Sequence, residues 1–180
     1  GMDLSTLKSY AYSSQKITKN IREQIKLKLK HFYEKLVNDK LSDIKDNSKL
    51  TIYKHVKINN TEEKYLTCSK LEFRKLITKF RLSDHNLLIE KGRYLKIPRE
   101  ERLCKNCKQI EDEIHFFLYC NRNHNNRKVY FDFLINENIH FINLNDIDKI
   151  TYILNPISHI QVNKLGSFLK QSIELRTGDS

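Results

Sequence analysis

Between residues 15 and 37, apolar side chains recur every three or four positions, as they do on one face of an α-helix. The stripe consists of Ile21, Ile25, Leu29, Phe32, Tyr33 and Leu36, and Arg22, Lys26 and Lys30 occupy the adjoining arc. This pattern predicts an amphipathic helix from about residue 15 to residue 37. We expect the stripe to belong to a hydrophobic core, and a partner-binding surface is the alternative.

The next part of the chain predicts a connection followed by two helices. Residues 38–60 are polar and contain the turn signals Asp-Asn-Ser and Asn-Asn, with one short apolar piece at 50–58. Ser69 and Glu72 have the spacing of a capping box, so a helix should run from about Lys70 to Leu82. Gly92 is expected to end a shorter helical stretch at 87–91.

The last third of the chain predicts three more helices. Apolar spacing indicates helices near 125–136 and 145–154, the second of which Pro156 should end. Ser158 should begin a final helix that continues through Ile173. The expected fold is therefore all-α or nearly so. We expect four segments, 2–48, 49–98, 99–124 and 125–180, of which the last three form one small compact helical unit.

Composition narrows the class of protein. The chain has 180 residues, 39% of them hydrophobic, which is adequate for a core. Only four glycines are present, which disfavours dinucleotide-binding folds and phosphate-binding loops, because both need glycine where backbone approaches phosphate. No apolar run approaches the roughly 20 residues of a membrane-spanning helix, and the N-terminus lacks a secretory pattern. We therefore expect an intracellular protein of the nucleus or cytoplasm, without a membrane partner.

Positive charge is concentrated in the middle of the chain. The formal net charge is +11, and residues 64–108 alone carry 13 basic and 5 acidic residues, a net +8. Such a patch is typical of proteins that bind polyanions, nucleic acid above all, although a general bias toward lysine is the alternative explanation. The candidate phosphate contacts are Lys70, Arg74, Lys75, Lys79, Arg81, Lys91, Arg93, Lys96, Arg99, Arg102, Lys105 and Lys108.

Cysteine and histidine residues supply the clearest chemical motif. Cys104, Cys107, His115 and Cys120 form the pattern C-x2-C-x7-H-x4-C within 17 residues. Three thiolates and one imidazole can close a tetrahedral site around Zn²⁺, with no position left for water, which is typical of a structural zinc knuckle of the CCHC type. Reduced cysteines beside a core histidine are the alternative. His124 could replace His115 as the nitrogen ligand, whereas Cys68 stands alone and is expected to be a partly buried small side chain.

Residues near this motif have further expected roles. Asp112 should cap a short helix that carries His115 and Cys120, and Glu111 and Glu113 should lie at the same helix start, where negative charge is favourable. Four aromatic residues could stack on unpaired bases if they are exposed, although they are more typical of the core of a small zinc site. They are Tyr94, Phe116, Phe117 and Tyr119.

Three sequence blocks occur together and in order. Residues 80–94 read F-R-L-S-D-H-N-L-L-I-E-K-G-R-Y, residues 99–107 read R-E-E-R-L-C-K-N-C, and residues 111–120 read E-D-E-I-H-F-F-L-Y-C. From about residue 50 to residue 176, the chain resembles the C-terminal zinc-binding region of non-LTR retrotransposon reverse transcriptase polyproteins. The resemblance implies a nucleic-acid-binding module that helps a neighbouring polymerase domain engage template RNA or target DNA. It also implies that the same four residues bind zinc. The polymerase is not implied, because the chain has no adjacent pair of aspartates.

Two short motifs resemble pieces of nucleases. Ser83-Asp84-His85 resembles the ending of the retroelement endonuclease, and His124-Asn125-Asn126 resembles part of a ββα-metal nuclease. Neither has the additional carboxylates or hairpin that those enzymes need, so we expect structural roles and no catalytic residues. The expected function is therefore non-catalytic, zinc-stabilised nucleic-acid binding. A zinc-stabilised protein-interaction module and a metal-dependent nuclease are the alternatives.

Overall fold

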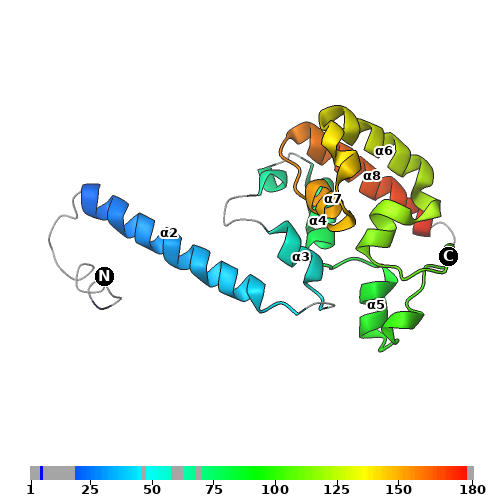
Figure 1. The fold of residues 1–180 in the computed structure, drawn as a ribbon, viewed down its shortest axis with the longest axis horizontal. Helices are drawn as coiled ribbons and strands as arrows, with labels where there is room; N and C mark the ends of the chain where they lie inside the picture. Colours follow the sequence, from blue (N-terminus) through cyan, green and yellow to red (C-terminus); the bar gives the residue numbers. More distant parts are fainter. Residues whose placement is uncertain (1–4, 6–18, 46–47, 58–62, 68–69, 178–180) are drawn as a thin grey trace. The chain divides into compact units, whose positions relative to one another are not determined.

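The structure is a computed structural model that describes residue 5 and residues 19–45, 48–57, 63–67 and 70–177 (Figure 1). The chain divides into two compact units, residues 1–43 and residues 44–180. In the described ranges every regular element is a helix, apart from a single antiparallel bridge between Leu103 and Ile110. The prediction of an all-α fold is confirmed.

Unit 1 contains the 24-residue helix α2, Lys19–Ser42. Residues 15–18 of the expected helix lie outside the described residues. At the other end the prediction was wrong, because α2 continues five residues beyond residue 37 into the expected connection. Neither glycine nor proline occurs between residues 38 and 42 to stop it. In the last turn, the Ser42 hydroxyl donates a hydrogen bond to the Asp39 carbonyl oxygen at 2.7 Å.

The apolar stripe of α2 is exposed rather than part of a core. Leu29, Phe32 and Tyr33 are 42%, 60% and 52% exposed, respectively. A helix buries an apolar stripe only where another element packs against it. The expectation that this stripe forms a core is therefore wrong for these side chains.

Unit 2 contains six α-helices and five short helical turns among its described residues. The α-helices are α3 (Thr51–Val56), α4 (Leu71–Arg81), α5 (Leu88–Tyr94), α6 (His124–Glu137), α7 (Asp146–Leu154) and α8 (His159–Thr177). The turns are η1 (Lys64–Thr67), η2 (Arg99–Glu101), η3 (His115–Tyr119), η4 (Asn121–Asn123) and η5 (Ile139–Asn143). Helix α4 contacts α3, α7 and α8, and α6 lies along α8 (Figure 1). None of the helices in the described ranges has the length and apolar character that crossing a membrane requires.

The predicted helices near 70–82, 125–136 and 145–154 are confirmed by α4, α6 and α7. The predicted start of the last helix is also confirmed, because the Ser158 hydroxyl accepts a hydrogen bond from the Gln161 backbone N–H at 3.1 Å. At the start of α7, the Asn145 side chain accepts one from the Asp148 N–H at 2.9 Å. Ser69, the expected cap of α4, lies outside the described residues.

The core of unit 2 is built around α4 and α8. Phe80 of α4 lies 4.9 Å from Phe116, ring centroid to centroid, and Phe117 stacks on Phe168 of α8 at 5.8 Å. The two helices approach closely at Gly166, where a Cβ atom would lie only 2.2 Å from Cγ of Phe73. Glycine is therefore required at this contact, since any side chain would displace the Phe73 ring.

Gly92 does not end a helix, contrary to the sequence prediction. Helix α5 runs through Gly92 to Tyr94, and no glycine in the described residues has a positive φ. Gly92 is buried, and a Cβ atom there would lie 2.7 Å from Cγ of Arg102. The Arg102 guanidinium crosses this position and donates hydrogen bonds to the carbonyl oxygens of Ile97 and Ile89, both at 2.9 Å. The missing side chain thus makes room for Arg102.

Candidate metal centre and basic cleft

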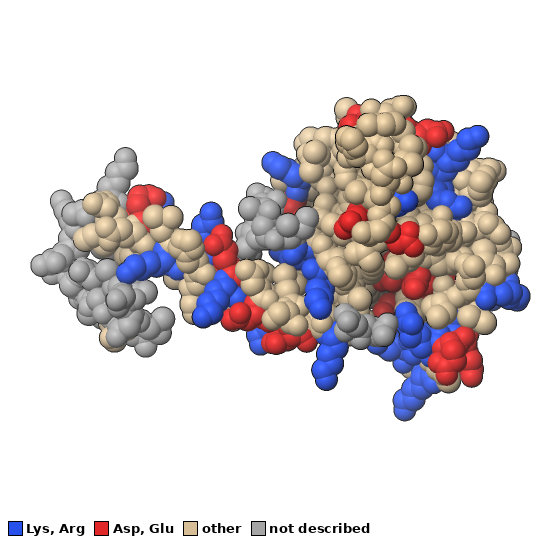
Figure 2. Space-filling view, in the orientation of Figure 1, with Lys and Arg blue, Asp and Glu red and all other residues tan. Residues whose placement is uncertain are grey.

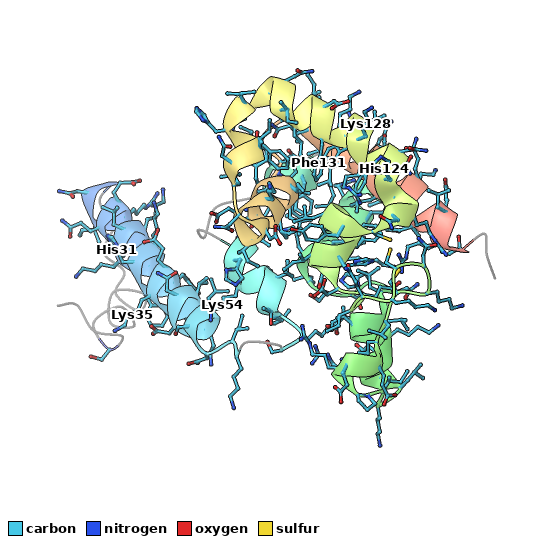
Figure 3. The ribbon with its side chains drawn as sticks, turned by 45° about the vertical axis from the view of Figure 1, so that its right-hand side comes forward. His31, Lys35, Lys54, His124, Lys128 and Phe131 are labelled. Atoms are coloured by element: carbon cyan, nitrogen blue, oxygen red, sulfur yellow. The ribbon has the colours of Figure 1, made fainter. Side chains whose placement is uncertain are left out.

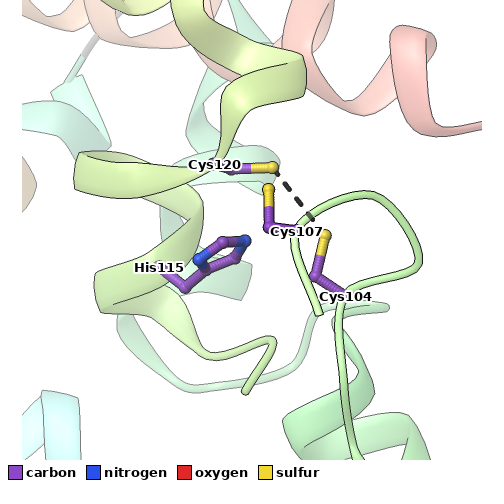
Figure 4. Close-up of side chains that lie close together, drawn as sticks. All are labelled: Cys104, Cys107, His115 and Cys120. Atoms are coloured by element: carbon purple, nitrogen blue, oxygen red, sulfur yellow. Dashed lines mark hydrogen bonds between the residues drawn. The ribbon is translucent and has the colours of Figure 1, made fainter. Parts of the chain in front are cut away.

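Cys104 and Cys107 lie on a tight hairpin, residues 103–110. The Cys104 N–H donates to the Gln109 carbonyl oxygen at 2.7 Å, and the Lys108 N–H donates to the Cys104 carbonyl oxygen at 2.9 Å. Lys108 has a φ of 57°, in the left-handed region, which reverses the chain direction after Cys107. The two thiol groups therefore lie on the same side of one turn (Figure 4).

His115 and Cys120 lie at the two ends of a π-helical turn, η3. The Asp112 carboxylate accepts a hydrogen bond from the His115 N–H at 2.8 Å, which confirms its predicted capping role. The Cys120 N–H donates to the His115 carbonyl oxygen at 2.7 Å, five residues back. In an α-helix, residues five apart point about 140° away from each other. The wider π turn reduces this angle, so both side chains face the hairpin.

The four predicted ligands are brought together. One potential ligand atom from each of Cys104, Cys107, His115 and Cys120 lies within 4.8 Å of all the others (Figure 4). The sulfur atoms of Cys104 and Cys120 are 4.0 Å apart. Cys107 is half-buried and the other three residues are buried. We call these four residues the Cys/His cluster. Its geometry makes it a possible metal site.

The His115 ring is already oriented for metal binding. Its Nδ1 atom lies 3.2 Å from the Gln109 side-chain oxygen, which can only accept a hydrogen bond, so the proton belongs on Nδ1. The Nε2 atom is buried and has no hydrogen-bond partner among the described residues. A buried acceptor without a partner is costly, and a metal ion would satisfy it. If the cluster holds a metal, Gln109 would be the residue that orients this ligand.

The protonation of these side chains also fits a metal site. Burial raises the pKa of Cys120 to about 11. Burial also acts to raise the pKa of Cys107, but hydrogen bonds from the Asn121 N–H and the Asn106 side chain outweigh it, and the net shift is downward. Burial lowers the pKa of His115, which favours the neutral imidazole that binds metals. Metal binding would thus have to displace a proton from Cys120.

Two arginines lie beside the Cys/His cluster. Arg127 donates a hydrogen bond to the Cys120 carbonyl oxygen at 2.8 Å, and Arg176 lines the same cleft as Cys104, with which it interacts electrostatically. A divalent cation with three thiolates has a net charge of −1, which these two guanidinium groups would offset. Neither arginine was identified from the sequence, because both lie outside the basic middle of the chain and reach the cluster only through folding.

His124 does not join the Cys/His cluster. It is the first residue of α6 (Figure 3), and it is exposed. It does not belong to the group of converging ligand atoms. The alternative that His124 supplies the nitrogen ligand is therefore wrong. Cys68, the fourth cysteine of the chain, lies outside the described residues.

Ser83 and His85 belong to a buried hydrogen-bond network. Both bond to the Glu113 carboxylate, the Ser83 hydroxyl at 2.8 Å and His85 Nε2 at 2.9 Å. Burial alone would raise the pKa of Glu113, but the hydrogen bond and charge of His85 and the Ser83 hydroxyl lower it overall. These contacts link the end of α4 to the segment before the π turn and account for both residues structurally.

Glu111 and Glu113 lie at the helix start, as expected, but their carboxylates bond to other elements. Glu113 bonds to Ser83 and His85 instead. Glu111 accepts a hydrogen bond from the Leu88 N–H, in the first turn of α5, at 2.7 Å, and it also pairs with Arg176. Both carboxylates therefore join separate elements, and Asp112 alone among the three caps its own helix.

The twelve candidate phosphate contacts differ in how much they are exposed. Arg81 is 1% exposed and forms an ion pair with Glu63 at 2.8 Å, so its assignment to a nucleic-acid surface is wrong. Arg74, Arg93 and Arg102 are half-buried, and Arg102 is held by backbone carbonyl groups. The exposed residues are Lys70, Lys75, Lys79, Lys91, Lys96, Arg99, Lys105 and Lys108.

Many of these side chains come from α5 and the residues after it. Figure 2 shows Lys and Arg side chains gathered at the lower edge of unit 2, where α5 lies, with acidic side chains next to them. We use the name basic face for the basic residues of α5 and of the segment that follows it as far as the hairpin. They are Lys91, Arg93, Lys96, Arg99, Lys105 and Lys108.

A cleft of about 640 Å³ adjoins the Cys/His cluster. Residues from α4, α5, the hairpin, η4 and α8 form its walls, and Cys104 is one of them. Five basic residues line it: Lys79, Lys91, Lys105, Arg122 and Arg176. Sequence reasoning identified the three lysines but missed the two arginines, because only the tertiary structure places residues 122 and 176 beside α4 and α5.

The aromatic residues divide into two groups. Phe116 and Phe117 are fully buried, so they belong to the core and cannot stack on bases. Tyr94 and Tyr119 are 71% and 51% exposed. The Tyr119 hydroxyl donates to the Asp146 carboxylate at 2.7 Å, and the Tyr94 hydroxyl accepts a hydrogen bond from Lys49 Nζ at 3.2 Å. Tyr94 is the better candidate for stacking because more of its side chain is exposed.

In comparisons with known proteins, no family model matches the chain, and neither the curated proteins nor the solved structures yield a significant match. The resemblance to the retrotransposon polyproteins therefore rests on the quoted sequence blocks alone and stays a prediction.

Proposed function

We propose that this chain is a non-catalytic nucleic-acid-binding module whose fold is stabilised by one structural zinc ion in the Cys/His cluster. The observation that carries the proposal is the position of Lys105 and Lys108, which lie on the same hairpin as Cys104 and Cys107. An ion held by the cysteines would fix the directions of both lysines. The metal ion would then hold part of the basic face in the conformation that binds nucleic acid.

Zinc is the metal that fits this donor set best. Three thiolates and one imidazole are the ligands that tetrahedral structural zinc sites use, whereas magnesium and calcium prefer oxygen ligands. The buried His115 Nε2, which has no hydrogen-bond partner in the described part of the chain, supports the same assignment. Four protein ligands leave no open position for water or phosphate, so the proposal includes no hydrolytic role for this ion.

Binding would depend mainly on phosphate contacts. Lysine and arginine side chains release condensed counterions when they neutralise phosphates, which makes affinity fall steeply with salt. The exposed Tyr94 ring, beside the basic face, offers a surface on which an unpaired base could stack. The sequence resemblance adds the expectation that the nucleic acid is a template RNA or a target DNA, engaged beside a polymerase domain.

The exposed stripe of α2 favours a second candidate function. Leu29, Phe32 and Tyr33 expose apolar surface that a protein partner could cover. In this alternative the protein is a zinc-stabilised protein-interaction module, and the basic face is only solvated.

Titration of labelled single-stranded RNA, single-stranded DNA and duplex DNA at several salt concentrations tests the proposal. We expect binding whose affinity falls with salt. In the variant Lys96→Ala/Arg99→Ala, the slope of the logarithm of affinity against the logarithm of salt concentration should become shallower. The change should be up to about 1 for each phosphate that the protein no longer neutralises. Lys128→Ala, an exposed lysine of α6 that is not part of the basic face, is the matched control and should leave the slope unchanged. If none of the three nucleic acids binds at low salt, the protein-interaction alternative is favoured.

A further inference from the structure

We infer that the cleft beside the Cys/His cluster holds a phosphate-bearing unpaired nucleotide, so that the module prefers single-stranded nucleic acid to duplex. This inference rests on the proposed function and narrows its substrate class. It concerns the cleft residues, which are distinct from most of the basic face.

Charge in the cleft favours an anion. Lys79, Lys91 and Lys105 come from three different elements and are exposed, and none of them forms an ion pair with a residue that the structure describes. The carboxylate in the cleft wall, Glu111, is already paired with Arg176 and bonded to the Leu88 N–H. The three lysine charges are therefore not offset within the cleft.

The shape of the cleft favours a small part of a nucleic acid. Its volume of about 640 Å³ equals that of a cube of about 9 Å on each side. Sites of about 300–1,000 Å³ accommodate drug-sized ligands, which is the size of one or two nucleotides. The major groove of B-DNA alone is about 12 Å wide, so a duplex cannot enter such a space. An unpaired strand can turn one phosphate into it.

The remaining walls could receive the rest of a nucleotide. Leu76 and Ile173 are partly buried apolar residues on opposite helices, α4 and α8, and both line the cleft. Asn86 is exposed at the cleft, and its amide can donate and accept hydrogen bonds with a base edge. Lysines, apolar walls and one amide together suit a sugar, a base and a phosphate better than they suit a free inorganic anion.

The test compares two double variants of the full chain that remove equal charge. Lys79→Gln/Lys105→Gln changes the cleft, and Lys96→Gln/Lys108→Gln changes the basic face outside it. Each is titrated with a labelled 20-nucleotide single strand and with the duplex of the same sequence. We expect the cleft variant to lose about tenfold in affinity for the single strand, and less than about threefold for the duplex. The variant Lys96→Gln/Lys108→Gln should lower the affinity for the single strand and for the duplex to a similar degree.

Equal losses for single strand and duplex in the cleft variant would overturn the inference but leave the proposed function intact. Absence of all binding by the unmutated chain would overturn both. Circular dichroism and bound-zinc content must match those of the unmutated chain. If the double variant fails this check, the single variant Lys91→Gln replaces it. We then expect a greater loss of affinity for the single strand than for the duplex. Equal losses of affinity would overturn the inference.

Discussion

Two regions of unit 2 are held together by different means. The Cys/His cluster draws the hairpin and the π turn together through four side chains within 17 residues of sequence. The contact of α4 with α8 joins residues more than 90 positions apart, with Phe73 packed directly against Gly166. In our proposal the first region depends on a bound zinc ion, whereas the second depends on the complementary shapes of its side chains.

This difference predicts that the two regions fail separately. Loss of the metal should loosen the hairpin first, because the hairpin buries few apolar side chains of its own, whereas the aromatic cluster around Phe80 remains packed. Overpacking at Gly166 should disturb the helical core and leave the four ligand atoms able to meet. The following experiments test that separation, beginning with the largest expected effect.

The largest effect is expected from Cys107→Ser. Metal affinity and folding are coupled in zinc modules, where binding contributes about 10 kcal/mol or more, so loss of one thiolate should cost several kcal/mol and remove the ion. Elemental analysis of protein purified without a chelating column should fall from one zinc per chain to near zero. Hydrogen exchange should speed up in residues 103–110 more than in α4 and α8. His124→Ala is the control and should keep its zinc, and an unmutated folded chain without metal would contradict the assignment.

The second effect is a steep pH dependence of metal affinity. Because burial raises the pKa of Cys120 to about 11, this thiol is protonated in the metal-free chain at pH 6–8 and loses its proton on binding. Each proton displaced lowers the apparent affinity about tenfold per unit fall in pH. Between pH 8 and pH 6 the affinity should therefore fall at least about 100-fold. Competition titration with a chromogenic chelator measures it, and a flat profile would show that Cys120 is not a ligand.

Gly166→Ala should destabilise the helical core without removing the metal. The new Cβ would lie 2.2 Å from the Phe73 ring, so the two helices must separate or the ring must move. Overpacking of this kind costs about 1–3 kcal/mol, which outweighs the gain in helix propensity of about 1 kcal/mol. Urea unfolding measures the change.

Gly92→Ala is the matched comparison, and it should cost less, because the new Cβ atom would lie 2.7 Å from Cγ of Arg102, farther than the approach to Phe73 in Gly166→Ala. Both variants should retain one zinc per chain. Zinc loss in Gly166→Ala would show that the two regions are not independent.

The smallest effect concerns the backbone of the hairpin. Lys108 has a φ of 57°, which costs a residue other than glycine about 1 kcal/mol. Lys108→Gly should therefore be neutral or stabilising by up to about 1 kcal/mol, whereas Lys108→Val should be destabilising, because a β-branched residue fits this conformation poorly. Thermal unfolding of the zinc-bound protein compares the two. A greater loss for glycine than for valine would contradict the hairpin geometry.

The local sequence pattern was sufficient to predict features that depend on residues within one element. The starts of α7 and α8, the capping role of Asp112 and the convergence of the four ligands all depend on residues close in sequence. The spacing of Cys104, Cys107, His115 and Cys120 limits how far apart their side chains can lie, so the cluster could be predicted without the fold. The identity of the metal stays a prediction from its donor set.

The local sequence pattern gave wrong predictions for features that depend on residues far away in the sequence. Gly92 reads as a helix stop, but Arg102 occupies the space beside it. Glu111 and Glu113 read as charges at a helix start, but their partners Arg176 and Ser83 come from other elements. The exposed stripe of α2 had the spacing of a core helix, and spacing alone does not tell whether a second surface covers it.

The sequence by itself determined that this chain is helical, that it carries a Cys/His cluster and that its middle third is basic, because periodicity, ligand spacing and charge are properties of neighbouring residues. Only the tertiary structure decided which basic residues can meet a partner. It buried Arg81 against Glu63 and brought Arg122 and Arg176 to the cleft with Lys79, Lys91 and Lys105. Burial and convergence depend on contacts between residues far apart in sequence, and these form only when the helices pack together.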